Sequence, residues 1–193
     1  QIPVIGVTPY LQIDIEDEDS LSERLVKTQN IEGRIEIAVI RFPHISNFTD
    51  FNILERIGEV SLRYVKSVQD LMNPDMIILP GTKNTIADLK WMRENGLETV
   101  IKKAAKKGTV IFGICGGFQM LGDKITDSEE IEACGIVTGM QLLSVETVFA
   151  TEKIRTSVNG HFAEIEGPLH SLSYAAVSGY EIHMGMTESR NEV

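Results

Sequence analysis

Short apolar runs alternate with amphipathic segments through the first two thirds of the chain. Runs rich in β-branched residues at 35–40, 61–68, 75–79 and 110–114 predict buried strands. Residues 51–60 predict a helix or helical turn. Residues 85–94 predict a helix with Asn84 or Thr85 as N-cap, and residues 98–107 predict another that Gly108 ends. Strands that alternate with helices predict an α/β fold with a doubly wound, mostly parallel sheet.

The pattern changes at both ends of this region. After Gly122, short apolar runs at 141–148, 154–158, 162–165 and 180–184 predict antiparallel strands added at one edge of the sheet. Residues 1–30 read as a lead-in, with an apolar segment at 2–10 and a nearly continuous acidic run at 14–20 that predicts a solvated linker. Residues 31–193 are therefore expected to form one domain.

Composition narrows the classes of function. The formal net charge of −10 argues against non-specific binding to nucleic acid, and the one basic cluster, at 102–107, is interpreted as the solvated face of a helix. The longest apolar runs, such as 76–79, are far too short to cross a bilayer. Two cysteines are too few for a disulfide scaffold, and no spacing of Cys and His suggests a metal site, so a cytoplasmic location is expected.

Cys115 stands in a pattern typical of a nucleophile. Residues 113–122, GICGGFQMLG, follow a strand and predict a short helix, so the cysteine would occupy a sharp strand-to-helix turn between glycines. The N–H groups and partial positive charge at the start of that helix would favour a thiolate. The N–H of Gly116 could stabilise an oxyanion, with a second donor from the turn at 80–82. The alternative is that Cys115 is a small buried apolar residue. Cys134, which has no such context, is expected to be structural.

Four motifs, in order along the chain, resemble a known family. They are RFPHISNFTDF at 41–51, LPGTKNTIADL at 79–89, GICGGFQMLG at 113–122 and GYEIHMG at 179–185. The third resembles the nucleophile motif of class I glutamine amidotransferases, whose fold is flavodoxin-like. All four together are similar to the glutaminase domain of cobyric acid synthases, and the resemblance extends from about Pro3 to Thr187.

The resemblance implies glutamine hydrolysis and transfer of the ammonia, with ATP, to carboxylates of cobyrinic acid a,c-diamide. In that family the ATP and magnesium belong to a separate N-terminal, corrin-amidating domain, whose phosphate loop is absent from this sequence. Residues 1–30 resemble the tail of that domain. The expected partners are therefore glutamine and the N-terminal domain, with no cofactor or metal in the present domain, no nucleic acid and no membrane.

The resemblance also implies roles for single residues. Cys115 would attack the side-chain amide of glutamine, and the backbone N–H groups of Gly81 and Gly116 would stabilise the oxyanion. Gln119 matches the family position that helps to hold the substrate. Its alternative is an amide on the helix surface.

The resemblance also bears on which residue is the general base. His161 and His170 are interpreted as surface residues, and His183 as a residue near the site, structural or facing the substrate. The family's catalytic histidine lies in a later Gly-Thr-Tyr-x-His-Gly segment, which does not occur before Val193. The chain is therefore expected to be truncated at its C-terminus and poorly active by itself.

Three other functions stay open at this point. One is a related amidotransferase, either a cobyrinic acid diamide synthase or a lipid II isoglutamyl enzyme. Another is a non-catalytic partner or regulatory domain with the same fold. The third is a cysteine hydrolase of another substrate, which would share the elbow but not the other three motifs.

Overall fold

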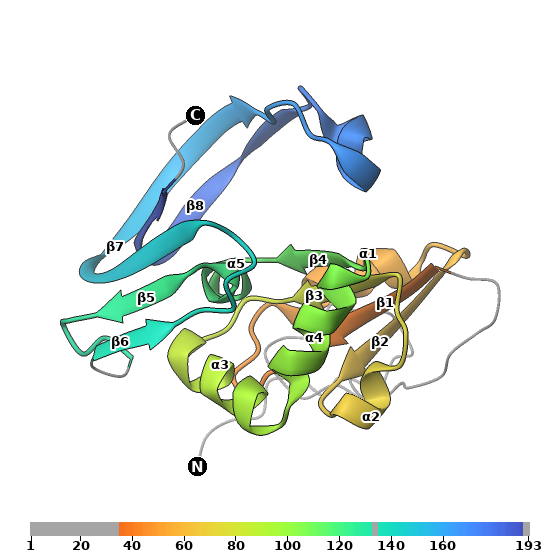
Figure 1. The fold of residues 1–193 in the computed structure, drawn as a ribbon. Coiled ribbons are helices and arrows are strands. Elements are labelled where there is room, and N and C mark those ends of the chain that lie inside the picture. Colours follow the sequence, from red (N-terminus) through yellow and green to blue (C-terminus); the bar gives the residue numbers. More distant parts are fainter. Residues whose placement is uncertain (1–34, 133–134, 191–193) are drawn as a thin grey trace, which may run out of the picture.

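The computed structural model describes residues 35–132 and 135–190, whose strands form two four-stranded sheets (Figure 1). The first sheet has the order β2-β1-β3-β4, and all its strands are parallel. They are β1 (Ile35–Ile40), β2 (Val60–Val65), β3 (Met76–Leu79) and β4 (Val110–Gly113). The second sheet has the order β6-β5-β7-β8. Its strands are β5 (Lys124–Asp127), β6 (Gly135–Thr138), β7 (Val145–His161) and β8 (Ala176–Ser189).

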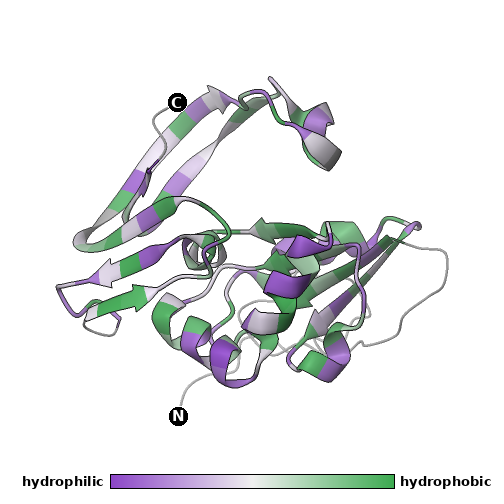
Figure 2. Cartoon of the chain, in the orientation of Figure 1, coloured by the Kyte–Doolittle hydropathy of each residue, from purple (hydrophilic) through white to green (hydrophobic). Residues whose placement is uncertain are grey.

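The first sheet is covered on both faces, as in a doubly wound fold. Successive strand residues point to opposite faces, so Ala38, Ile40 and Ile77 belong to one core cluster and Val39 and Ile78 to another. The first cluster includes residues of α2 (Val68–Leu71), α3 (Thr85–Glu94), α4 (Leu97–Lys106) and α5 (Gly116–Leu121). The second includes residues of the 3₁₀ helix η2 (Phe48–Phe51), and Leu54 of α1 (Asn52–Glu55) packs against it. The hydrophobic strands behind the polar faces of α3 and α4 are visible in Figure 2. The prediction of an α/β fold with a mostly parallel sheet is confirmed.

Most of the helices and strands predicted for the first sheet and the helices around it are present. The helix α3 has the predicted bounds, because the side chain of Asn84 accepts a hydrogen bond from the N–H of Ala87 and so caps its start. The helix α4 begins one residue before its predicted start, after Gly96, and ends at Lys106, one residue before its predicted end. Residues 51–60 form the end of η2, α1, a turn and the first residue of β2.

The strand predicted for 61–68 is too long at its end. The strand β2 stops at Val65, and Val68 begins α2. Ser67 caps α2 by accepting from the N–H of Asp70 and donating its hydroxyl to the Asp70 carboxylate. The buried guanidinium of Arg63 also donates to the carbonyl groups of Asp70 and Leu71, so α2 is held against β2. These local polar bonds outweigh the apolar alternation that predicted a longer strand.

The later strands form a separate sheet instead of extending the edge of the first. The strand β5 pairs antiparallel with β6 and parallel with β7, and β7 pairs antiparallel with β8. The hairpin of β7 and β8 projects from the rest of the chain in Figure 1. Residues 162–165 are not a strand, because they cross the end of this hairpin towards the 3₁₀ helix η3 (Gly167–Leu172).

Residues 141–144, predicted as the start of a strand, cap a helix instead. The N–H groups of Gln141, Leu142 and Leu143 donate to carbonyl groups at residues 121 and 122, at the end of α5. A helix leaves its last carbonyl groups without partners inside the helix, and this segment supplies partners. It therefore joins α5 of the first sheet to β7 of the second.

The lead-in at 1–30 and Cys134 lie outside the described residues. Within 35–132 and 135–190, no helix combines the length and the apolar character that a bilayer span requires.

We expect Ile77→Ala to lower the free energy of unfolding by about 2–5 kcal/mol, since Ile77 is fully buried in the central strand β3 and its truncation leaves a cavity. Ile53→Ala is the matched control, because that side chain on α1 is 68% exposed and its loss should change stability by less than about 0.5 kcal/mol. Urea unfolding followed by circular dichroism measures both. Equal losses in the two variants would contradict this assignment of the core.

Candidate active site

Cys115 occupies a strained turn between β4 and α5. It is the N-cap of α5, with φ 50° and ψ −112°. A residue other than glycine rarely has a positive φ, and such strain costs on the order of 1–3 kcal/mol. The side chain is exposed, so Cys115 is not the buried apolar residue that was the alternative. The predicted elbow is present, with the sulfur presented to solvent at the carboxyl end of the parallel sheet.

Close backbone packing fixes this turn. The N–H of Ile114 donates to the carbonyl of Leu79 at 2.9 Å, which continues the pairing of β4 with β3. A Cβ at Gly117 would lie 2.0 Å from that same carbonyl oxygen, and a Cβ at Gly113 would lie 2.7 Å from the Cα of Phe118. Only glycine fits at these two positions. The first turn of α5 therefore rests directly on the end of β3.

The two residues predicted as oxyanion donors flank Cys115. Gly81 follows β3, and a Cβ placed on it would lie 3.9 Å from the Cβ of Cys115. Gly116 is buried and begins α5. In the part of the chain that the structure describes, neither of these N–H groups is paired with an acceptor. Two donors without partners on either side of an exposed thiol are what an oxyanion site requires.

Gln119 is buried and not on the helix surface. Its side-chain amide donates to the carbonyl of Met184 at 3.2 Å, and its amide oxygen accepts from the hydroxyl of Thr85 at 3.5 Å. The alternative of a surface amide is therefore wrong. The side chain links α5 to β8 of the second sheet, and it lines the cavity beside Cys115.

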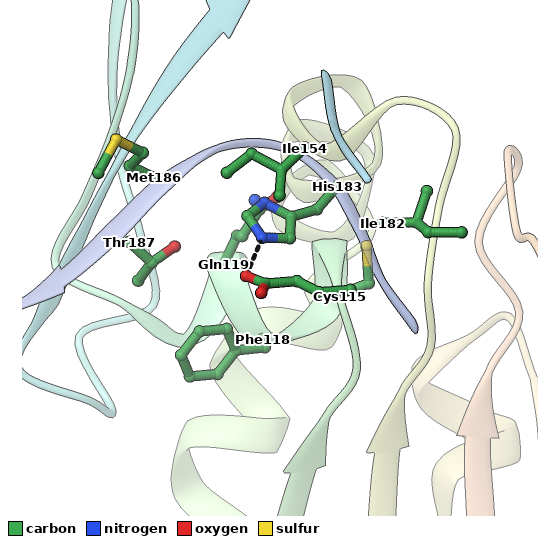
Figure 3. A pocket seen from close by; sticks show the side chains of 9 residues that line it. Cys115, Phe118, Gln119, Ile154, Ile182, His183, Met186 and Thr187 are labelled. Atoms are coloured by element: carbon green, nitrogen blue, oxygen red, sulfur yellow. Dashed lines mark hydrogen bonds and ion pairs between the residues drawn. The ribbon is translucent and has the colours of Figure 1, made fainter. Parts of the chain in front are cut away.

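His183 lies across that cavity from Cys115 (Figure 3). Its Nδ1 is 2.8 Å from the carbonyl oxygen of Gly185, and its Nε2 is 2.7 Å from a carboxylate oxygen of Glu181. Both ring nitrogens therefore face an acceptor oxygen. In the described structure neither nitrogen is hydrogen-bonded to the sulfur of Cys115, the contact that a general base makes with its nucleophile. His161 and His170 are exposed, as predicted.

Two adjoining cavities meet at Cys115. One, of about 450 Å³, is lined by Phe118, Ile154 and Met186 among others. The other, of about 540 Å³, contains charged groups from Asp50, Lys83 and Glu132. Cys115, Gln119, Ile182 and His183 line both. Across the described residues, no group of three or more possible ligands could hold a metal ion.

One part of the site is not predicted by the sequence. Asp88 of α3 is fully buried and bonds to His44 and Thr82, which lie in the loops after β1 and β3. Ser46 also lines the second cavity, beside Gly81. Both loops belong to motifs that the sequence singles out. The polar residues that follow the buried strands are a sequence signal for such a site. The signal does not show which of them bond to Asp88, because His44 is 44 residues from Asp88 in sequence and Thr82 is 6 residues from it.

Comparison with known proteins gives the family. The model of the CobB/CobQ-like glutamine amidotransferase domain matches residues 36–193. The chain belongs to this family. The cobyric acid synthases of Ruminiclostridium cellulolyticum, Lachnoclostridium phytofermentans and Moorella thermoacetica are 56%, 54% and 50% identical to it over 97%, 95% and 95% of its length. This glutamine amidotransferase domain spans only 36% of the length of each of these relatives.

Two solved structures share the fold of this amidotransferase domain. A structure titled as a glutamine amidotransferase has a TM-score of 0.52 at 20% identity and covers 80% of this chain and 74% of its own. The structure of PurLQS from Thermotoga maritima has a TM-score of 0.56 at 22% identity, with coverages of 83% and 72%. At these identities the likeness shows the fold.

We expect Gly117→Ala to destabilise the domain by about 3 kcal/mol, at the upper end for overpacking, because the added methyl group meets the backbone oxygen of Leu79. Gly58→Ala is the control, since nothing lies within 4 Å of a Cβ there and φ is not positive. Thermal unfolding of the two variants tests the contact. A Gly117→Ala protein as stable as the Gly58→Ala protein would show that α5 does not rest on β3 in this way.

Proposed function

We propose that this domain hydrolyses glutamine through Cys115 and supplies the ammonia to an amidation reaction of cobyric acid synthesis. The observation that carries the proposal is the strained, exposed Cys115 beside Gly81 and Gly116, for whose N–H groups the described structure shows no acceptor. Membership of the amidotransferase family and 43–56% identity to cobyric acid synthases support it.

The reaction begins with attack by the thiolate of Cys115 on the side-chain carbonyl carbon of glutamine. The C–N bond breaks, the nitrogen takes a proton and leaves as ammonia, and a glutamyl thioester remains on the sulfur. Water then cleaves the thioester to glutamate and restores the thiol. During both steps the negative oxygen would lie between the N–H groups of Gly81 and Gly116. Losing one such donor typically costs about 3 kcal/mol of transition-state stabilisation.

The charged groups of the second cavity suit an amino acid substrate. Glutamine carries an ammonium and a carboxylate group on its α-carbon. Lys83 lines the cavity as a cation, and Asp50 and Glu132 line it as anions. Gln119, which lines the same cavity, would contribute to holding the substrate next to Cys115.

The ammonia would be used by a part of the whole protein outside this domain. Relatives named cobyric acid synthase are nearly three times as long as this chain. We propose that the remainder binds ATP and magnesium and amidates carboxylates of cobyrinic acid a,c-diamide, while the present domain needs no cofactor. The two cysteines of the sequence support a reducing compartment, the cytoplasm, as the place of action.

Cys115→Ser should abolish glutamine hydrolysis and covalent labelling by the glutamine analogue diazo-oxo-norleucine, because a serine hydroxyl lacks the thiolate's nucleophilicity. Cys134→Ser, which removes the other cysteine, should leave both unchanged. Glutamate release and intact-protein mass measure the two effects in the complete natural polypeptide. Labelling that survives Cys115→Ser would overturn the proposal. A wild-type protein that neither hydrolyses glutamine nor takes the label would favour a non-catalytic domain of the same fold.

His183→Asn should keep at least about one tenth of the wild-type kcat for glutamine hydrolysis. Both ring nitrogens face acceptors, so we do not expect His183 to be the general base. Loss of a general base typically lowers the rate about 10²–10⁴-fold. A fall of that size at saturating glutamine, with an unchanged melting temperature, would instead assign the proton transfer to His183.

A further inference from the structure

A buried carboxylate joins the loops on which the oxyanion donors depend. Asp88 of α3 is fully buried, and it accepts hydrogen bonds from three donors. The ring Nδ1 of His44 lies 2.8 Å from its Oδ1, and the backbone N–H of His44 donates to its Oδ2 at 3.3 Å. The hydroxyl of Thr82 also donates to Oδ2.

The two loops that Asp88 holds are also paired with each other. The N–H of Ser46 donates to the carbonyl of Gly81 at 2.9 Å, and the N–H of Lys83 donates to the carbonyl of His44 at 2.9 Å. Ile45 and Thr82 form an antiparallel bridge between these bonds. Gly81 is therefore fixed by a short ladder whose two sides are both held by Asp88.

Thr82 also contacts Gly116, the second proposed oxyanion donor. A Cβ placed on Gly116 would lie 2.6 Å from the side-chain methyl carbon of Thr82 and 3.0 Å from the hydroxyl of Thr85. Thr82 thus packs against the backbone of Gly116 while its hydroxyl is bonded to Asp88. A displacement of Thr82 would move both the Gly81 turn and the surface on which Gly116 rests.

We propose that Asp88 is a positioning residue for the oxyanion site, acting through Thr82 and His44. Asp88 does not line either cavity at Cys115 in the described structure, so it does not act on the substrate directly. This role rests on the proposed function, because it concerns where Gly81 and Gly116 lie relative to Cys115.

The chemistry of the side chain explains why an aspartate suits this position. An ionised carboxylate is an acceptor at both oxygens, which satisfies all three donors, and bonds to an ionised group are about twice as strong as neutral ones. An asparagine of the same shape would place an NH₂ donor where one acceptor oxygen stands, so His44 or Thr82 would have to become the acceptor and the bonds to an ionised group would be lost. Asp88→Asn therefore changes the hydrogen bonding with little change in volume.

The test compares two reactions of Cys115 in the complete natural polypeptide. Glutamine hydrolysis forms an oxyanion, whereas alkylation by iodoacetamide displaces iodide and forms none. Asp88→Asn should lower the kcat for hydrolysis about 10- to 100-fold, somewhat less than the roughly 10²- to 10³-fold loss on removing a donor outright. It should change the KM for glutamine and the alkylation rate by less than about threefold.

Thr82→Val and His44→Ala probe the same network if Asp88→Asn does not fold. Thr82→Val keeps the methyl contact and removes the hydroxyl, and His44 is half exposed, so its ring can be removed without opening the core. Each should lower kcat in the same direction. Combined with Asp88→Asn, each should give less than the product of the separate losses, because the variants remove the same hydrogen bonds.

Asp75→Asn is the control for the same chemical change at an exposed carboxylate outside the site. Its carboxylate also accepts a backbone N–H, that of Glu36 at 2.8 Å, and it also joins the neighbourhoods of β1 and β3. It does so at the amino ends of the strands, away from Cys115. Asp75→Asn should leave kcat unchanged.

Three results would overturn the proposal. Unchanged kcat in Asp88→Asn, with hydrolysis that depends on Cys115, would remove the positioning role and leave the proposed function intact. Alkylation that changes as much as hydrolysis would assign to Asp88 a merely structural effect. Hydrolysis that survives Cys115→Ser would overturn the proposed function and the positioning role together.

Discussion

The backbone of Gly117 lies against the carbonyl group of Leu79, so closely that a methyl group there would be 2.0 Å from the oxygen. The rest of the site depends on this contact. It places the start of α5 directly over the end of β3, and it forces Cys115 into its strained conformation at the turn. Because β3 also leads into Gly81, one contact brings together the thiol and the two glycines that we propose as oxyanion donors. The strain is sustained because close packing on both sides of the turn leaves no room for relaxation.

The sequence predicts well those features that depend on neighbouring residues. Asn84 caps α3, so that helix has the predicted bounds. The glycines around Cys115 predict the elbow, since sharp turns require residues without side chains. Local signals were also overlooked. Ser67 and Asp70 have the spacing of a helix cap, and they begin α2 inside what the apolar pattern predicted as a strand.

Features that depend on distant residues could not be predicted in the same way. Nothing near Gln119 in the sequence indicates that its amide bonds to Met184, 65 residues away. Residues 141–144 read as a strand because they are apolar, yet they cap α5. Whether late strands extend an existing sheet or form a second one depends on pairing partners, and periodicity contains no information about partners. The buried contacts of Asp88 belong to the same class.

Residues of both sheets line the site: the thiol and the glycines beside it come from the first sheet, and the facing wall of the cavity comes from the second. Cys115, Gly81 and Gly116 all belong to the first sheet and its loops, whereas Ile182 and His183 come from β8 of the second. The space beside the thiol is therefore bounded by the first sheet on the side of Cys115 and by the second sheet on the side of His183. The bond between Gln119 and Met184 is a direct mechanical link between the two sheets at the site. Substitutions in the hairpin would therefore change the shape of the cavity wall that β8 forms, whereas the turn at Cys115 depends on the packing of α5 on β3.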